Sequence, residues 1–225
     1  MINLVIFDLD GTLLNTLQDL ADCTNYILRK RNYPEHPLDS FRYFVGDGIR
    51  KLIERAIPEN ERFSENIDKI MADFLSYYHL HHADKTAPYE GIIPVLNELN
   101  RKNILIAVAS NKAHELMVPI MEHYFPKIRF AAAIGNRKGV PTKPDPAIVT
   151  EILQLTKISD TETLYFGDTS VDMKTAAAAG IRKIGVLWGF RDSDELISAG
   201  ADQLINKPEE ITKIIDLYNS KNEKK

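Results

Sequence analysis

Short unbroken runs of apolar residues mark one part of this chain, and apolar residues at helical spacing mark another. The first run, residues 4–7, has the length of a strand and ends abruptly in the polar segment 8–12. Such a run is typical of a strand that is buried on both faces of a parallel sheet. Five further segments have the length and composition of strands: residues 104–109, 130–134, 164–166, 183–187 and 202–205.

Residues 15–85 contain no strand-like run. Their apolar residues recur instead at the spacing of an amphipathic helix. Three segments show this spacing: residues 14–31, 49–57 and 61–82. The two prolines within residues 32–40 predict a loop there. This part of the chain is therefore predicted to be an all-helical unit.

Beyond residue 86 the predicted strands alternate with six predicted helices, at residues 92–102, 114–123, 146–156, 172–179, 194–199 and 208–218. Strands separated by helices predict a parallel sheet with right-handed crossovers and helices on both faces. We therefore expect an α/β fold with a Rossmann-like core, made of residues 1–14 and 84–225. Residues 15–83 would form a small helical cap, inserted after the first strand. The ligand crevice of such a sheet lies at the carboxyl ends of its strands, so the cap would cover that edge.

Composition argues against several kinds of partner. The formal net charge of −4 mixes acids with bases and offers no basic surface for nucleic acid. No window holds the roughly 20 apolar residues that a membrane span requires. The single cysteine, Cys23, cannot form an intrachain disulfide, which fits a reducing compartment. We expect a cytoplasmic monomer or homodimer with an exposed tail at residues 220–225.

Two acids, Asp8 and Asp10, directly follow the first predicted strand. Strand alternation sends both side chains to the same side, and Gly11 allows the backbone to turn sharply after them. Two neighbouring anions repel each other unless a cation or a shared proton offsets their charges. The pair therefore predicts a chemical site, although two solvated acids in an ordinary turn are the alternative.

Polar residues with complementary chemistry follow the other predicted strands or stand between them: Ser110 and Asn111, Lys143, and Asp168 with Asp172. Because the carboxyl ends of parallel strands share one edge of the sheet, these side chains are expected to converge on Asp8 and Asp10. Each has an ordinary explanation when taken alone, as a helix-capping serine, a surface lysine or acids that complement a helix dipole.

The chemistry that this group could perform is phosphoryl transfer. Asp8, Asp168 and, as a further candidate, Asp172 offer the few carboxylate oxygens that Mg²⁺ prefers. Lys143 and Ser110 offer a cation and a donor to phosphate oxygens. One aspartate could then attack phosphorus, while the other protonates the leaving alkoxide and later activates water.

Four segments, in this order along the chain, resemble the motifs of the haloacid dehalogenase superfamily: Asp8–Thr12, Ser110-Asn111, Lys143-Pro144 and Gly167–Asp172. The chain looks most like the phosphoglycolate phosphatase branch, which carries a small helical cap after the first motif. One departure is Asn15-Thr16, where relatives usually have Asp-Ser.

The resemblance implies a role for each motif residue. Asp8 would be the nucleophile, and Asp10 the acid and base as well as a backbone ligand of Mg²⁺. Ser110 with Asn111 and Lys143 would bind the phosphate. Asp168 would bind Mg²⁺ directly, and Asp172 would bind it directly, through water or through Lys143.

The cap loop at residues 45–48 is the remaining candidate site. Gly46, with free amides around it, and the nearby Arg50 could contact the far end of the substrate. Both glycines of the loop could equally be plain turn residues.

The predicted function is a Mg²⁺-dependent phosphatase that hydrolyses a small phosphorylated metabolite through an aspartyl-phosphate. Phosphoglycolate leads the candidate substrates by resemblance alone. A sugar phosphomutase of the β-phosphoglucomutase type or a pyrophosphatase could use the same core. A receiver-like phosphate-binding regulatory module is the non-enzymatic alternative, although it would not need a cap that encloses a small molecule.

Overall fold

The core of the protein is a six-stranded parallel sheet with the strand order β5-β4-β1-β6-β7-β8. The structure is a computed structural model, and it describes residues 1–222. Its strands are β1 (Leu4–Phe7), β4 (Leu105–Ala113), β5 (Ala132–Asn136), β6 (Thr163–Gly167), β7 (Arg182–Val186) and β8 (Gln203–Ile205). The α/β fold predicted from the alternation of strands and helices is confirmed.

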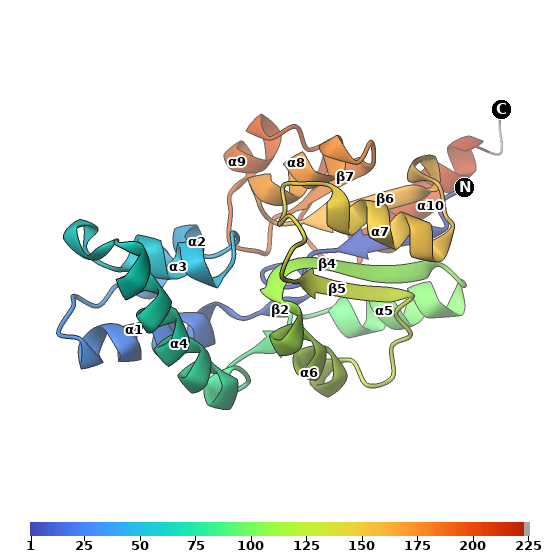
Figure 1. Cartoon of the computed structure of the whole chain (residues 1–225). Coiled ribbons are helices and arrows are strands. Elements are labelled where there is room, and N and C mark those ends of the chain that lie inside the picture. The colour runs from blue at the N-terminus through green and yellow to red at the C-terminus, as the bar shows by residue number, and fades with distance from the viewer. Residues whose placement is uncertain (223–225) are drawn as a thin grey trace.

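Helices cover both faces of this sheet (Figure 1). The apolar residues of one face pack against α5 (Ile92–Arg101), α6 (His114–Tyr124) and α10 (Glu210–Asn222). Those of the other face pack against α7 (Ala147–Thr156) and α8 (Ser170–Ala178). Because both faces are covered, the strands carry almost continuous apolar runs instead of an alternating pattern.

Strand β1 lies at the centre of the sheet, and its register positions the polar residues that follow it. Phe7 is level with Val108 of β4 and with Phe166 of β6. The next residues along these three strands therefore emerge side by side at the carboxyl edge of the sheet. This edge is where open parallel sheets bind ligands.

A separate group of helices lies on the side of the sheet toward which β4 and β5 point (Figure 1). Its members are α1 (Leu17–Lys30), α2 (Leu38–Phe44), α3 (Ile49–Ala56) and α4 (Ser64–His81). We call these four helices and the segments between them the helical unit. They share a hydrophobic core of their own, to which the sheet domain adds Leu116 and Phe190. These two residues dock the helical unit on the rest of the protein.

Several element boundaries differ from the prediction. Helix α2 begins inside the predicted loop of residues 32–40, directly after Pro37, whose backbone φ of −65° is already suited to a helix start. Residue 14 does not begin a helix, because Leu14–Asn15 pairs with Ala87–Pro88 in a two-stranded antiparallel sheet, β2 and β3. This small sheet joins the two chain segments that connect the helical unit to the core.

Two further boundaries bear on the site. Strand β4 continues to Ala113, so Ser110 and Asn111 lie within an irregular end of the strand and not at the start of a helix. Helix α8 begins at Ser170, two residues before the predicted start, because Thr169 and Asp172 form a capping box.

The carboxyl-terminal helix also extends beyond its predicted end. Helix α10 continues to Asn222, so the first half of the predicted tail at residues 220–225 is helical. The last three residues of that tail lie outside the described residues. None of the helices within residues 1–222 is both long enough and apolar enough to cross a membrane.

A buried carboxylate ties the helical unit to the returning chain. Asp19 of α1 is 2% exposed and accepts hydrogen bonds from the backbone amides of Lys85 and Thr86, at 2.9 and 2.8 Å. The hydroxyl of Thr86 donates a further bond to it at 2.7 Å. Hydrogen bonds to a charged group in a buried position are among the stronger ones in a protein.

We predict that Asp19→Ala lowers the free energy of unfolding by about 2–3 kcal/mol, because it leaves buried amides without acceptors. The matched control is Asp22→Ala on the same helix, which removes an exposed ion pair with Lys85. That variant should cost less than about 1 kcal/mol. Urea denaturation of the two variants measures the difference, and equal losses would show that Asp19 does not hold this junction.

Candidate active site

Three carboxylates converge at the carboxyl edge of the sheet. Asp8 follows β1, Asp168 follows β6, and Asp172 lies in the first turn of α8. One oxygen from each lies within 4.8 Å of the others, and all three residues are buried. Such proximity concentrates negative charge in a place where water cannot screen it.

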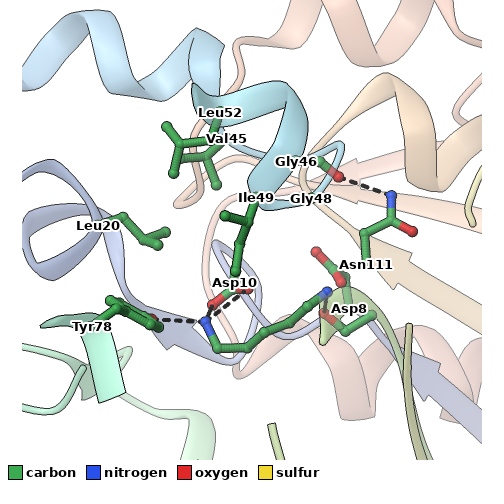
Figure 2. Close-up of a pocket in the computed structure, with 12 residues that line it drawn as sticks. Asp8, Asp10, Leu20, Val45, Gly46, Gly48, Ile49, Leu52, Tyr78 and Asn111 are labelled. Atoms are coloured by element: carbon green, nitrogen blue, oxygen red, sulfur yellow. Dashed lines mark hydrogen bonds and ion pairs between the residues drawn. The ribbon is translucent and has the colours of Figure 1, made fainter. Parts of the chain in front are cut away.

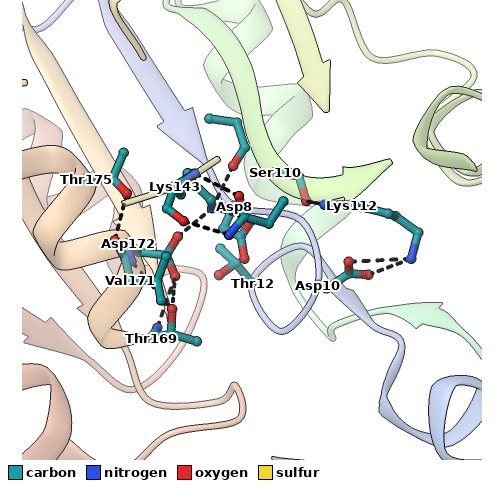
Figure 3. A network of polar contacts seen from close by, with 12 residues as sticks. Asp8, Asp10, Thr12, Ser110, Lys112, Lys143, Thr169, Val171, Asp172 and Thr175 are labelled. Carbon is teal, nitrogen blue, oxygen red and sulfur yellow. Dashed lines mark hydrogen bonds and ion pairs between the residues drawn. The ribbon is translucent and has the colours of Figure 1, made fainter. Parts of the chain in front are cut away.

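The ammonium group of Lys143 lies among these carboxylates (Figure 3). Its Nζ donates to Asp8 Oδ1 at 2.8 Å and to Asp172 Oδ1 at 2.7 Å. It also contacts the carbonyl oxygen of Ala109 at 2.9 Å and the hydroxyl of Tyr165 at 3.1 Å. One buried cation therefore compensates two of the three acids.

Asn111 holds the segment that carries Lys143. Its side-chain oxygen accepts a bond from the Lys143 amide at 2.9 Å, and its side-chain nitrogen donates to the Lys143 carbonyl at 3.1 Å. The same nitrogen donates to the carbonyl of Gly46 at 3.0 Å. Asn111 thus connects β4, the lysine segment and the loop between α2 and α3.

The pKa values of the buried acids show that charge compensation is incomplete. Burial raises the pKa of Asp8 to about 7; the ammonium of Lys143 opposes this rise and the carboxylate of Asp172 adds to it. Burial, together with the carboxylates of Asp172 and Asp8, raises the pKa of Asp168 well above its usual value. Burial alone would lower the pKa of Lys143, but Asp172 and Asp8 raise it well above the ordinary value. The site therefore favours an additional cation.

The surroundings of Asp168 fit a magnesium ion. Its two oxygens accept bonds from the hydroxyl of Thr12 at 3.0 Å and from the amide of Phe190 at 2.8 Å. Both donors are neutral, and among the described residues no ion pair involves this fully buried carboxylate. Gly11, at φ +95°, packs so closely that an added Cβ would collide with the Asp168 carboxylate. Hard oxygen donors of this kind are the ligands that Mg²⁺ prefers.

Asp10 lies apart from the three-carboxylate group. Its side chain pairs with Lys112, whose Nζ lies 3.2 and 3.4 Å from the two carboxylate oxygens. The same Nζ donates to the hydroxyl of Tyr78, on α4 of the helical unit, at 2.8 Å. The sequence analysis assigned no function to Lys112 or Tyr78. A tyrosine on the apolar face of a helix is normally interpreted as a core residue. Only the position of Lys112 directly after Ser110 and Asn111 could have singled it out.

The other predicted binding residues lie in different places. Ser110 is buried beside Asp8, and its hydroxyl accepts a bond from the Lys112 amide at 3.2 Å. Gly46 lines a cavity between the core and the helical unit, which is described below. Arg50 does not line that cavity, and its guanidinium instead pairs with Asp68 on the exposed surface of the helical unit. The binding roles of these residues stay predictions.

A cavity of about 40 Å³ lies between the core and the helical unit (Figure 2). The core side of its wall is polar and contains Asp8, Asp10, Ser110, Asn111 and Lys112. The helical unit supplies mainly apolar side chains: Leu20, Val45, Ile49 and Leu52. The volume is on the order of three water molecules.

The parallel sheet and the carboxylate–lysine site at its carboxyl edge suit chemistry on a phosphate group. The chain belongs to the haloacid dehalogenase-like hydrolase family, whose model matches residues 5–186. The predicted family and the prediction of a phosphoric monoester hydrolase are both confirmed by this match and by the relatives described next.

Curated relatives carry the name phosphoglycolate phosphatase. The protein from Mesorhizobium japonicum is 33% identical over 84% of this chain and 84% of its own length. The protein from Chromobacterium violaceum is 31% identical over 97% of both chains. A solved structure of a provisionally assigned phosphoglycolate phosphatase, from Lactobacillus delbrueckii subsp. bulgaricus, has a TM-score of 0.89 at 27% identity. It covers 95% of this chain and 98% of its own.

The raised pKa values predict how Mg²⁺ changes stability with pH. A carboxyl whose pKa is raised in the folded state stabilises the fold at low pH and loses that contribution as pH rises. For Asp8 the loss falls between about pH 4, its unfolded value, and about pH 7. A Mg²⁺ ion at this site would compete with protons for these oxygens, so we expect it to bind better at pH 8 than at pH 5.5.

We therefore expect saturating Mg²⁺ to raise the melting temperature by roughly 5–10 °C at pH 8, and by much less at pH 5.5. Differential scanning calorimetry measures both values. Asp168→Asn should reduce the increase at pH 8, whereas Asp39→Asn, at an exposed position of α2, should leave it intact. An increase that is the same at both pH values, or unchanged in Asp168→Asn, would place the ion elsewhere.

Proposed function

We propose that the protein is a Mg²⁺-dependent phosphatase that acts on a small phosphate monoester, with phosphoglycolate as the leading substrate. The observation that supports this most is the contact of Lys143 with both Asp8 and Asp172, beside the buried carboxylate of Asp168. We also propose a division into a core of residues 1–14 and 84–225 and a cap of residues 15–83.

In the proposed reaction Asp8 is the nucleophile. One of its oxygens is held by Lys143, while among residues 1–222 no donor contacts Oδ2, which is left to attack phosphorus. A bond forms between Asp8 and phosphorus as the bond from phosphorus to the leaving oxygen breaks. Asp10 gives its proton to that oxygen, and an alcohol departs.

The second half of the proposed reaction restores the enzyme. Asp10, now a carboxylate, takes a proton from a water molecule, whose oxygen attacks phosphorus and releases inorganic phosphate from Asp8. Lys143 and Ser110 would contact the phosphoryl oxygens throughout. Bound Mg²⁺, held by Asp8, Asp168, Asp172 and the backbone oxygen of Asp10, would neutralise charge on the phosphoryl group.

The amino-terminal end of a helix at the cavity supports a leaving group that carries its own negative charge. Gly48 and Ile49, at the amino-terminal end of α3, line the cavity, and among residues 1–222 no side chain caps this helix. Free amides and the helix dipole at this end favour an anion such as a carboxylate. Phosphoglycolate has its carboxylate one methylene group away from the ester oxygen, and relatives of this chain bear the name of its phosphatase.

A sugar phosphomutase or a pyrophosphatase remains the alternative on the same core. The phosphatase is preferred because curated relatives of this chain bear that name. A receiver-like regulatory module is disfavoured, because the chain belongs to a family of hydrolases. The proposed cellular compartment is the cytoplasm, and a monomer and a homodimer both remain open.

A panel of phosphorylated metabolites tests the proposed function. We expect kcat/KM for phosphoglycolate to exceed the values for ethyl phosphate and β-glucose 1-phosphate by about tenfold or more, which corresponds to about 1.4 kcal/mol of preferential binding. Removal of Mg²⁺ with a chelator should abolish turnover.

Two results would count against this function. A preference for β-glucose 1-phosphate over phosphoglycolate would favour a sugar phosphomutase. Turnover of pyrophosphate alone would favour a pyrophosphatase. Asp8→Asn is the control for contaminating phosphatases, because loss of the nucleophile should reduce activity by roughly 10³-fold or more.

A further inference from the structure

Lys112 is a buried lysine that has no role in the proposed reaction. Its side chain is 3% exposed, and its ammonium lies between the carboxylate of Asp10 and the hydroxyl of Tyr78. The ring of Tyr78 is also close, with its centroid 4.9 Å from Nζ. A charge so thoroughly removed from water is costly unless its partners are fixed in place.

The three N–H donors of this ammonium match three acceptors. These are the two oxygens of Asp10, at 3.2 and 3.4 Å, and the oxygen of Tyr78, at 2.8 Å. All three donors of Lys112 are thus engaged by protein acceptors. The two lysines divide the acids of the site, because Lys143 contacts Asp8 and Asp172 but not Asp10.

The contact with Lys112 constrains the direction of a proton on Asp10. An ammonium group can only donate hydrogen bonds. The O–H of a protonated Asp10 must therefore point away from Lys112, and Asp10 itself lines the cavity where a leaving group would lie. Lys112 thus orients the O–H of Asp10 toward the cavity and does not accept its proton.

Tyr78 belongs to the helical unit, whereas Asp10 and Lys112 belong to the core. The phenol is buried, and burial raises the pKa of Tyr78 to about 12 despite the nearby ammonium of Lys112. It is therefore neutral near pH 7 and acts as an acceptor through its oxygen. The position of Lys112, and through it that of Asp10, depends on where α4 of the helical unit is docked.

We propose that Lys112 is a positioning residue that holds the Asp10 carboxyl at the cavity for proton transfer, and that Tyr78 makes this position depend on the docked helical unit. The inference rests on the proposed function, in which Asp10 protonates the leaving oxygen. It predicts that loss of Lys112 slows the proton-dependent step and spares phosphate binding.

The test compares two substrates that differ in their need for an acid. An alkyl ester such as ethyl phosphate releases a strongly basic alkoxide and needs a proton in the transition state, whereas 4-nitrophenyl phosphate releases a stable phenolate. The ratio of their kcat/KM values isolates the transfer to Asp8, because kcat/KM ends at the first irreversible step. Asp10→Asn supplies the reference ratio for a site without the acid.

Four variants complete the design. Lys112→Met keeps the length of the side chain without its charge, and should lower kcat/KM for the alkyl ester by roughly 10–100-fold. For 4-nitrophenyl phosphate the loss should stay below about threefold, and the inhibition constant of inorganic phosphate should stay within about twofold. Lys112→Arg should recover part of the alkyl activity, because it keeps a cation that can contact both oxygens.

Tyr78→Phe removes one hydroxyl and should lower the alkyl activity by roughly 3–10-fold, with the same preference for the aryl ester. Its matched control is Tyr33→Phe, which removes a hydroxyl bonded to Glu61 elsewhere in the helical unit, and which should leave both substrates unaffected. Thermal melts of all variants in the presence of Mg²⁺ report on folding.

The outcomes separate this inference from the proposed function. If the wild-type protein hydrolyses none of phosphoglycolate, ethyl phosphate and 4-nitrophenyl phosphate, the proposed function fails and the inference fails with it. If the wild-type protein is active but Lys112→Met and Tyr78→Phe lose both substrates equally, or lose neither, only the positioning role is overturned. A loss confined to the alkyl ester, with the ratio moving toward that of Asp10→Asn, supports it.

Discussion

The ion pair between Lys143 and the carboxylates of Asp8 and Asp172 is the interaction on which the rest of the site depends. Without that ammonium, three buried acids would repel one another in a place where water screens their charges poorly. Even with it, the pKa values of Asp8 and Asp168 remain raised, so one lysine does not complete the compensation. The same electrostatic deficit that costs stability is what makes the site suited to a metal ion and a phosphate.

The fold supplies this interaction by register and by close packing. The central strand β1 ends level with Val108 of β4 and Phe166 of β6, so Asp8 emerges at the same edge as Ser110 and Asp168. Asn111 fixes the lysine segment from the side. Glycine at position 11 allows the chain to pass directly beside Asp168. The helical unit then closes the polar edge with an apolar wall, and charges act more strongly where bulk water is excluded.

Much of this arrangement could be predicted from the sequence, because strand-length apolar runs followed by acids report both the sheet and its carboxyl edge. The expected meeting of Asp8, Lys143 and Asp168 is what the fold produces, although their catalytic roles stay predictions. Periodicity could not find β2 and β3, which are two residues long each, and it placed Pro37 in a loop although proline also starts helices. The contact of Tyr78 with Lys112 could not be predicted from the sequence, because it joins residues 34 positions apart through tertiary packing alone.

The central claim is that the phosphoryl group is transferred to Asp8 while Lys143 and Asp168 hold it and its metal ion. Rapid acid quenching of turnover, followed by mass-spectrometric mapping of the phosphorylated peptide, tests this most directly. The account predicts a phosphoryl group on Asp8 that appears only with Mg²⁺ and is absent from Asp8→Asn. A phosphoryl group on another residue, or full turnover without any covalent adduct in a protein that retains Asp8, would contradict it.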